Sequence, residues 1–140
     1  MDPTQRLSID VIAANGKPIE PKEHAVKFVS QCGVLARDNI PITVQEWNEP
    51  KKNRPGVIFL SDRAKDDLWT KLMTNFNLPL DCNLEDEDGT PNPEGKRRMK
   101  KVREIALGKM AEAFRNWKKN LWEDYVKQEN KSSSSIQGNT

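Results

Sequence analysis

The last third of the chain carries the pattern that most limits its fold, an apolar stripe that repeats with the period of an α-helix. At 100° per residue, the stripe stays within a narrow sector of the helix surface. Its members are Met99, Val102, Ala106, Met110, Ala113, Trp117 and Leu121, with Phe114 and Tyr125 at its border. Residues 96–128 are therefore predicted to form a long helix whose apolar side packs on the rest of the domain. Gly108 leaves open whether this helix breaks.

The opposite side of the same helix is basic. Between Lys96 and Lys127 the chain has eleven Lys/Arg residues and four acidic ones, although its overall net charge is only +2. A cationic ridge that also carries an indole suits a phosphate backbone, because neutralising phosphates releases counterions and an aromatic ring can stack on bases. The ridge predicts nucleic-acid contacts by Arg97, Lys100, Lys101, Arg115, Lys118, Lys119 and Trp122.

The N-terminal part begins with a hairpin pattern. Apolar and polar residues alternate over Arg6–Ala14, which is typical of a half-buried strand. The pair Asn15-Gly16 follows and tolerates the positive φ of a tight turn. Lys17–Ile19 is then predicted to be a short return strand, and Pro18 confines that strand to an edge.

Two shorter helices and a third strand are predicted next. Apolar residues recur at helical spacing from Pro21 to about Arg37. Alternation over Ile40–Trp47 predicts a strand. Ser61 is a suitable N-cap for a helix that ends near Asn77. The predicted fold class is thus α+β and mostly helical, with a small N-terminal hairpin and three main helices.

The pattern divides the chain into four segments. Residues 1–79 form the N-terminal α+β part, and residues 80–95 form an acidic connector rich in proline and glycine. The basic helix of residues 96–128 packs on the same domain. Residues 129–140, with their serine tract, are predicted to be a disordered tail.

The sequence offers little support for catalysis. It contains none of the glycine-rich phosphate-binding, serine-nucleophile or HExxH motifs. Cys32 and Cys82 lie far apart and His24 is the single histidine, so a zinc site is not expected. We expect no enzyme activity, metal or cofactor. No stretch has the roughly 20 apolar residues of a membrane span, so no membrane partner is expected.

Several short motifs, in this order, resemble plant transposases of the Ptta/En/Spm type. The resemblance covers about residues 7–127. Its motifs are Asn15–Pro18, Gly33–Arg37, Ile40–Ile42 before Trp47, Asp67–Phe76, and Phe114–Leu121 before Tyr125. The closing motif also has a weaker similarity to the last helix of trihelix and Myb-like DNA-binding domains. The resemblance implies a transposon-derived plant protein, a nuclear location and a role in DNA transactions without transposase catalysis.

Two functions from different classes follow. The first is a non-catalytic module that binds duplex DNA through the basic side of the C-terminal helix. The alternative is a protein-interaction or oligomerisation module, in which Trp122 and Val126 pack on a second copy or on a transposase-related protein.

Overall fold

The computed structural model describes residues 6–138 apart from residue 53, and describes their side chains as far as residue 128. The chain is mostly helical, with short strands near its N-terminus, which confirms the predicted α+β class. The elements are β1 (Leu7–Ser8), β2 (Val11–Ile12), β3 (Pro18–Glu20), α1 (Lys22–Asn39), α2 (Asp62–Met73), β4 (Phe76–Asn77), the 3-10 turn η2 (Leu80–Cys82) and α3 (Pro93–Gly138).

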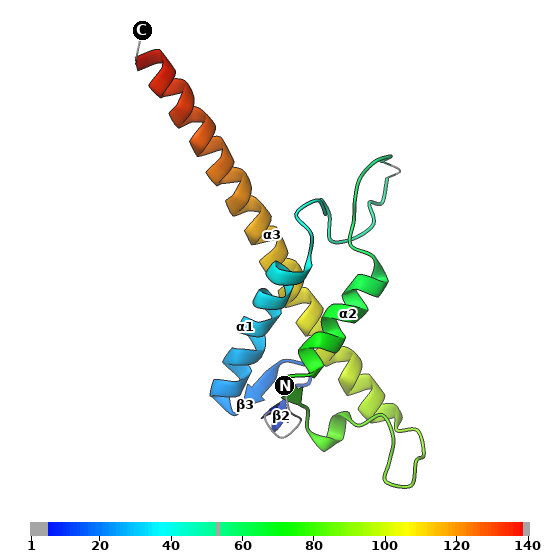
Figure 1. Cartoon of the computed structure of the whole chain (residues 1–140). Helices are drawn as coiled ribbons and strands as arrows, with labels where there is room; N and C mark the ends of the chain where they lie inside the picture. The colour runs from blue at the N-terminus through cyan, green and yellow to red at the C-terminus, as the bar shows by residue number, and fades with distance from the viewer. Residues whose placement is uncertain (1–5, 53, 139–140) are drawn as a thin grey trace.

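The long helix α3 is the element against which the other elements pack. The side chain of Asn92 accepts a hydrogen bond from the backbone N–H of Gly95 (3.1 Å) just as the helix begins. The helix continues without a break through Gly108, where an added Cβ would meet only open space. The other elements surround its first half, and its second half projects well beyond them (Figure 1).

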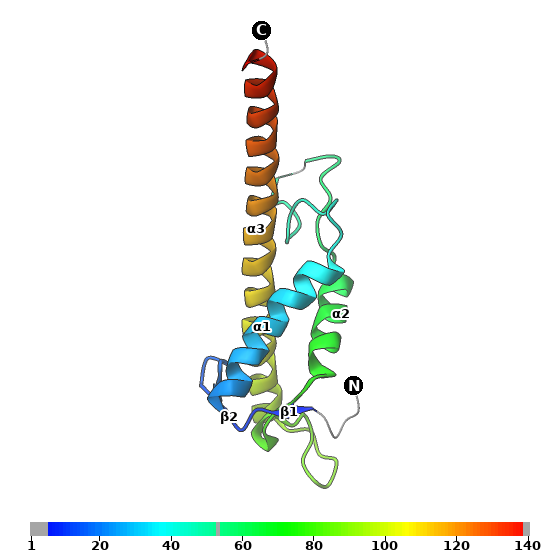
Figure 2. The ribbon, with the colours of Figure 1, turned by 60° about the vertical axis from the view of Figure 1, so that its left-hand side comes forward.

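One hydrophobic core joins α1, α2 and α3. Helix α1 makes its most extensive contact with α3, and Gly33 of α1 lies next to Ala113 of α3. Figure 2 shows α1 crossing α3, and α2 packs against both of these helices. The best-buried core residues from the three helices are Phe28, Cys32, Ala36, Leu68, Leu72, Val102, Ala106 and Met110.

Two short strand pairs hold the N-terminal segment. The predicted hairpin is present, with β2 and β3 antiparallel around the Asn15-Gly16 turn. The predicted single strand Arg6–Ala14 is instead divided into β1 and β2, and β1 pairs in parallel with β4. This pairing aligns Leu7 with Phe76. It ties the start of the chain to the segment that follows α2.

Helix α2 begins as predicted and ends earlier than predicted. The Ser61 hydroxyl accepts a hydrogen bond from the Ala64 N–H (3.1 Å), which confirms the N-cap. The helix stops at Met73 instead of near Asn77. The reason is that Phe76, whose spacing continues the apolar period of the helix, enters β4 and packs its ring edge-on against Phe28.

The predicted strand Ile40–Trp47 was wrong. The segment is irregular, with a turn in which Val44 N–H bonds the Pro41 carbonyl (3.1 Å) and an isolated bridge between Glu46 and Phe59. Pro41 has no N–H for a strand ladder, and the turn interrupts the alternation. Val44 and Trp47 are nevertheless buried in the core.

The structure gives the local conformation of the connector and the course of the helix beyond residue 128. Within residues 80–95, η2 buries Cys82, and backbone hydrogen bonds such as Asn92 N–H to the Leu84 carbonyl (2.9 Å) fold the acidic stretch back on itself. Helix α3 extends to Gly138, through most of the predicted disordered tail. No proline follows Pro93 in the sequence, and Gly138 is the first glycine after Gly108, so the residues between them contain no strong helix breaker.

Candidate functional site

The structure separates the predicted basic ridge into two groups. Arg97, Lys100 and Lys101 are exposed near the start of α3, and the other predicted residues begin at Arg115. Arg115 follows Lys101 by fourteen positions, which is a rise of about 21 Å along the helix. Between them, Ala111 lies in the sector of the ridge and is buried in the core. One continuous basic surface along α3 is therefore not formed.

The first group lies beside the hairpin. The Arg97 guanidinium pairs with the Glu94 carboxylate (2.7 Å), so its charge is partly neutralised. The Gly16 turn packs on the backbone of Lys101. Lys100 and Lys101 keep exposed side chains and form no ion pair within the described part of the chain.

In the second group, the side chain of one lysine takes part in tertiary contacts that hold the fold together. The Lys118 ammonium donates a hydrogen bond to the Ile42 carbonyl, and it lies 5.9 Å from the centre of the Phe114 ring and 5.8 Å from that of Trp117. Lys118 therefore holds the 40–47 segment against α3, and its ammonium is not free for phosphate. Lys119 lies 4.0 Å from the Glu123 carboxylate, and Arg115 is exposed.

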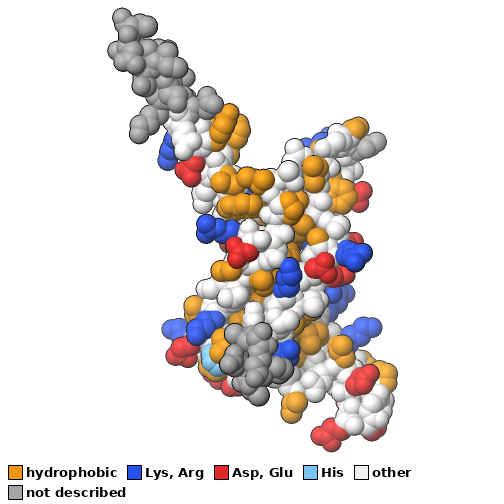
Figure 3. Space-filling view, in the orientation of Figure 1, with side chains coloured by type: hydrophobic (Ala, Val, Ile, Leu, Met, Phe, Trp, Pro, Cys, Tyr) orange, Lys and Arg blue, Asp and Glu red, His pale blue; other side chains and the backbone are white. Residues whose placement is uncertain are grey.

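Beyond Trp117 the helix leaves the core with large apolar side chains uncovered. Leu121, Trp122 and Tyr125 are 36%, 66% and 57% exposed, and we call these three residues the projecting stripe. They follow Lys118 at i+3, i+4 and i+7, so they share one side of the helix. The Trp122 and Tyr125 rings stack with centroids 6.2 Å apart. In Figure 3, apolar side chains gather where the helix leaves the body.

The sequence did not predict the projecting stripe as a unit. The helical period predicts Leu121 in the core and Tyr125 at its border, whereas Trp122 falls in the predicted basic ridge. The periodicity is correct as far as Phe114, which is buried, and Trp117 is half-buried. Periodicity does not indicate where the surrounding elements end, so it gave no signal that Leu121 lies outside them.

The surroundings of Cys32, Cys82 and His24 indicate that these residues have structural roles. Burial raises the pKa of the Cys32 thiol to about 12 and that of Cys82 to about 11. Both thiols are therefore protonated near neutral pH, and the reactive form of cysteine is the thiolate. His24 Nδ1 lies 2.7 Å from the Ser8 carbonyl oxygen. Among the described residues, no group of three or more metal-ligating side chains is gathered.

Comparisons with models of protein families, with curated proteins and with solved structures found no match. The resemblance to plant transposases therefore stays a prediction, as does a nuclear location. In the part of the chain that the structure describes, no helix has the length and apolar character needed to cross a membrane.

Proposed function

We propose that this chain is a non-catalytic interaction module that self-associates through the projecting stripe. The observation that carries the proposal is the exposure of Leu121, Trp122 and Tyr125 on a helix that has already left the core. Aromatic side chains grouped on one side of a projecting helix are typical of an interface, because covering them removes a large apolar area from water. Tryptophan and tyrosine are also the residues most enriched at interface hot spots.

Charge order along the helix favours a second copy as the partner. Lys119 precedes the middle of the stripe, and Glu123 and Asp124 follow it. An antiparallel pair of helices would place the lysine end of one copy beside the acidic end of the other. A parallel pair would align like charges, which is unfavourable. The same surface of both copies would then form a two-fold symmetric interface.

The test is the mass of the chain in solution as its concentration rises. The wild type is expected to shift from monomer to dimer in sedimentation equilibrium. Replacing Trp122 and Tyr125 together with serine should raise the dimer dissociation constant by about 30-fold or more, as expected when a hot spot of about 2 kcal/mol is lost.

Leu80→Ser is the matched control, because Leu80 is also highly exposed but lies far along the chain from the stripe. It should leave the dissociation constant unchanged. A wild type that stays monomeric at every concentration would refute the proposal, and so would a double variant that dimerises as well as the wild type.

The second candidate function is contact with duplex DNA, which the exposed Lys100 and Lys101 favour. Their affinity for phosphate would fall as salt rises, because each contact releases counterions. Reversing both charges with Lys100→Glu and Lys101→Glu should weaken binding and flatten the dependence of log Kd on log salt by about two units. Electrophoretic shifts at several salt concentrations measure both effects.

The control for the DNA test is the reversal of Lys51 and Lys52, two lysines in the loop before α2. It should have a smaller effect on affinity than the reversal on α3. If the wild type shows no binding at low ionic strength, or binding that is independent of salt, DNA is not a partner of this surface.

A further inference from the structure

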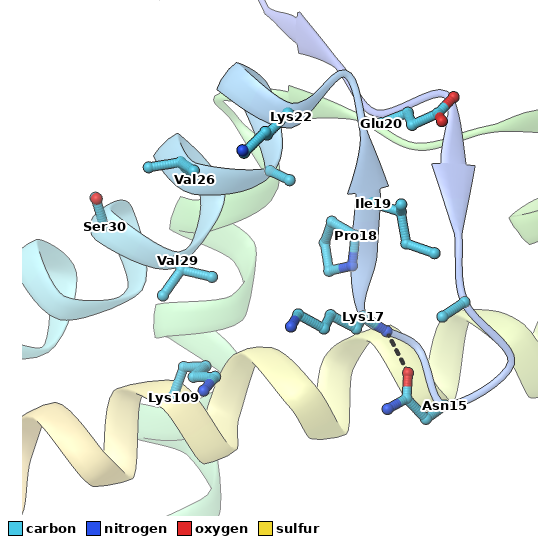
Figure 4. A pocket seen from close by; sticks show the side chains of 12 residues that line it. Asn15, Lys17, Pro18, Ile19, Glu20, Lys22, Val26, Val29, Ser30 and Lys109 are labelled. Atoms are coloured by element: carbon cyan, nitrogen blue, oxygen red, sulfur yellow. Dashed lines mark hydrogen bonds between the residues drawn. The ribbon is translucent and has the colours of Figure 1, made fainter.

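A groove that is separate from the projecting stripe lies between the β2–β3 hairpin and the first half of α1. Its volume is about 910 Å³. On the hairpin side the groove is lined by Pro18 and Ile19 of β3, of which Pro18 lies nearer α1 in Figure 4, and on the other side by Val26 and Val29 of α1. These valines do not belong to the buried side of α1, which is formed by Phe28, Cys32 and Ala36.

The rim of the groove is basic. Lys17, Lys22 and Lys109 come from the hairpin, α1 and α3, and they surround the apolar walls. In Figure 4, Lys17 and Lys109 lie toward one end and Lys22 toward the other. Glu20 is the one acidic residue among those that line the groove, and the Glu112 carboxylate lies 3.7 Å from the Lys109 ammonium, so Lys17 and Lys22 carry the larger unpaired part of the charge. The rim therefore favours an occupant with negative charges on both sides of its apolar part.

The walls of the groove are open to water. Ile19, Val26 and Val29 are 44%, 57% and 37% exposed. A small molecule in so open a site would stay largely solvated, whereas typical small-molecule pockets enclose most of their ligand. An elongated chain can instead cover the walls along the groove and reach the lysines at both ends.

We propose that the groove binds an acidic peptide segment of a partner protein, with aliphatic side chains against the walls and carboxylates beside Lys17, Lys22 and Lys109. Aliphatic side chains gain from covering Val26 and Val29, and carboxylates gain from the basic rim. DNA has the complementary charge but presents few aliphatic groups, so the apolar walls would remain exposed to water when DNA is bound. The proposal does not depend on the projecting stripe.

The test uses a fluorescein-labelled twelve-residue peptide composed of glutamate and leucine, titrated with the full chain and followed by fluorescence polarisation. Saturable binding is expected. Lys17→Glu with Lys22→Glu should weaken it at least about tenfold, and Val26→Gln should weaken it about threefold or more. Two comparison peptides, with glutamine for glutamate or serine for leucine, should both bind more weakly.

Matched controls lie on the same helix. Lys27 and Val34 are exposed residues of α1 that do not line the groove, so Lys27→Glu and Val34→Gln should change the affinity less than about twofold. The absence of saturable binding would overturn the proposal, as would equal losses in the groove variants and their controls. Tighter binding of a peptide with the sequence of residues 80–90 would also overturn it, because the occupant would then be a second copy.

Discussion

Replacing Gly16 with alanine is expected to lower the free energy of unfolding by about 3 kcal/mol, one of the largest effects of any single substitution in this chain. Gly16 has a φ of +94°, which costs a residue with a Cβ about 1–2 kcal/mol. The added Cβ would also lie 2.7 Å from the backbone nitrogen of Val102 and closer still to the Lys101 carbonyl. Urea denaturation followed by tryptophan fluorescence measures the loss.

Gly56→Ala separates the two causes of this effect. Gly56 also has a positive φ, of +82°, but an added Cβ there would meet nothing within 4 Å. Its substitution should therefore cost only the backbone strain, about 1–2 kcal/mol. Equal losses for the two alanine variants would show that the hairpin turn does not pack on α3 as described.

Phe28→Ala is expected to cost about 3–5 kcal/mol, because it leaves a cavity at the centre of the core. Phe28 is 0% exposed, and its ring meets that of Phe76 edge-on with centroids 5.1 Å apart. It thereby links α1 to the strand that follows α2. The shift of the thermal unfolding midpoint, followed by circular dichroism, measures the effect.

Phe59→Ala is the matched control, since Phe59 is an exposed phenylalanine at an isolated bridge and should cost much less. Phe28→Leu keeps most of the volume and should cost less than about 2 kcal/mol, so it remains measurable if the alanine variant does not fold. Comparable losses at positions 28 and 59 would contradict the assignment of Phe28 to the centre of the core.

Elements with local signals were predicted well from the sequence. The Asn15-Gly16 pair specifies a turn by its own backbone preference, and Ser61 caps α2 through a bond to a residue three positions away. The long apolar period of α3 identified the helix and its buried side as far as Phe114. In each case the residues that determine the structure lie within a few positions of one another.

Elements that depend on distant partners were predicted poorly. Phe76 continues the period of α2, yet it leaves the helix because β4 pairs with β1, almost 70 positions earlier. Ile40–Trp47 alternates like a strand, but among the described residues its one strand-like pairing is the isolated Glu46–Phe59 bridge, and Val44 and Trp47 are buried from an irregular loop. Tertiary pairing outweighed local propensity in both places.

The candidate site was predicted in part. The helix and its cations were identified, but the division of the ridge depends on what covers Ala111, and the engagement of Lys118 depends on the Ile42 carbonyl. Neither partner is close in sequence. The exposure of the projecting stripe likewise depends on where the other elements end along α3.

The position of α3 in the sequence has a consequence for the order in which the protein is synthesised. Helices α1 and α2 and the β1–β4 pair are complete by Asn77, but part of their core comes from Val102, Ala106 and Met110 of α3. At about 5–20 residues per second, the ribosome needs a few seconds to add the residues between Asn77 and Phe114. During that interval the apolar side of α1, with Phe28 and Cys32, lacks its covering helix, so this surface stays exposed to water and open to non-native contacts until α3 is added.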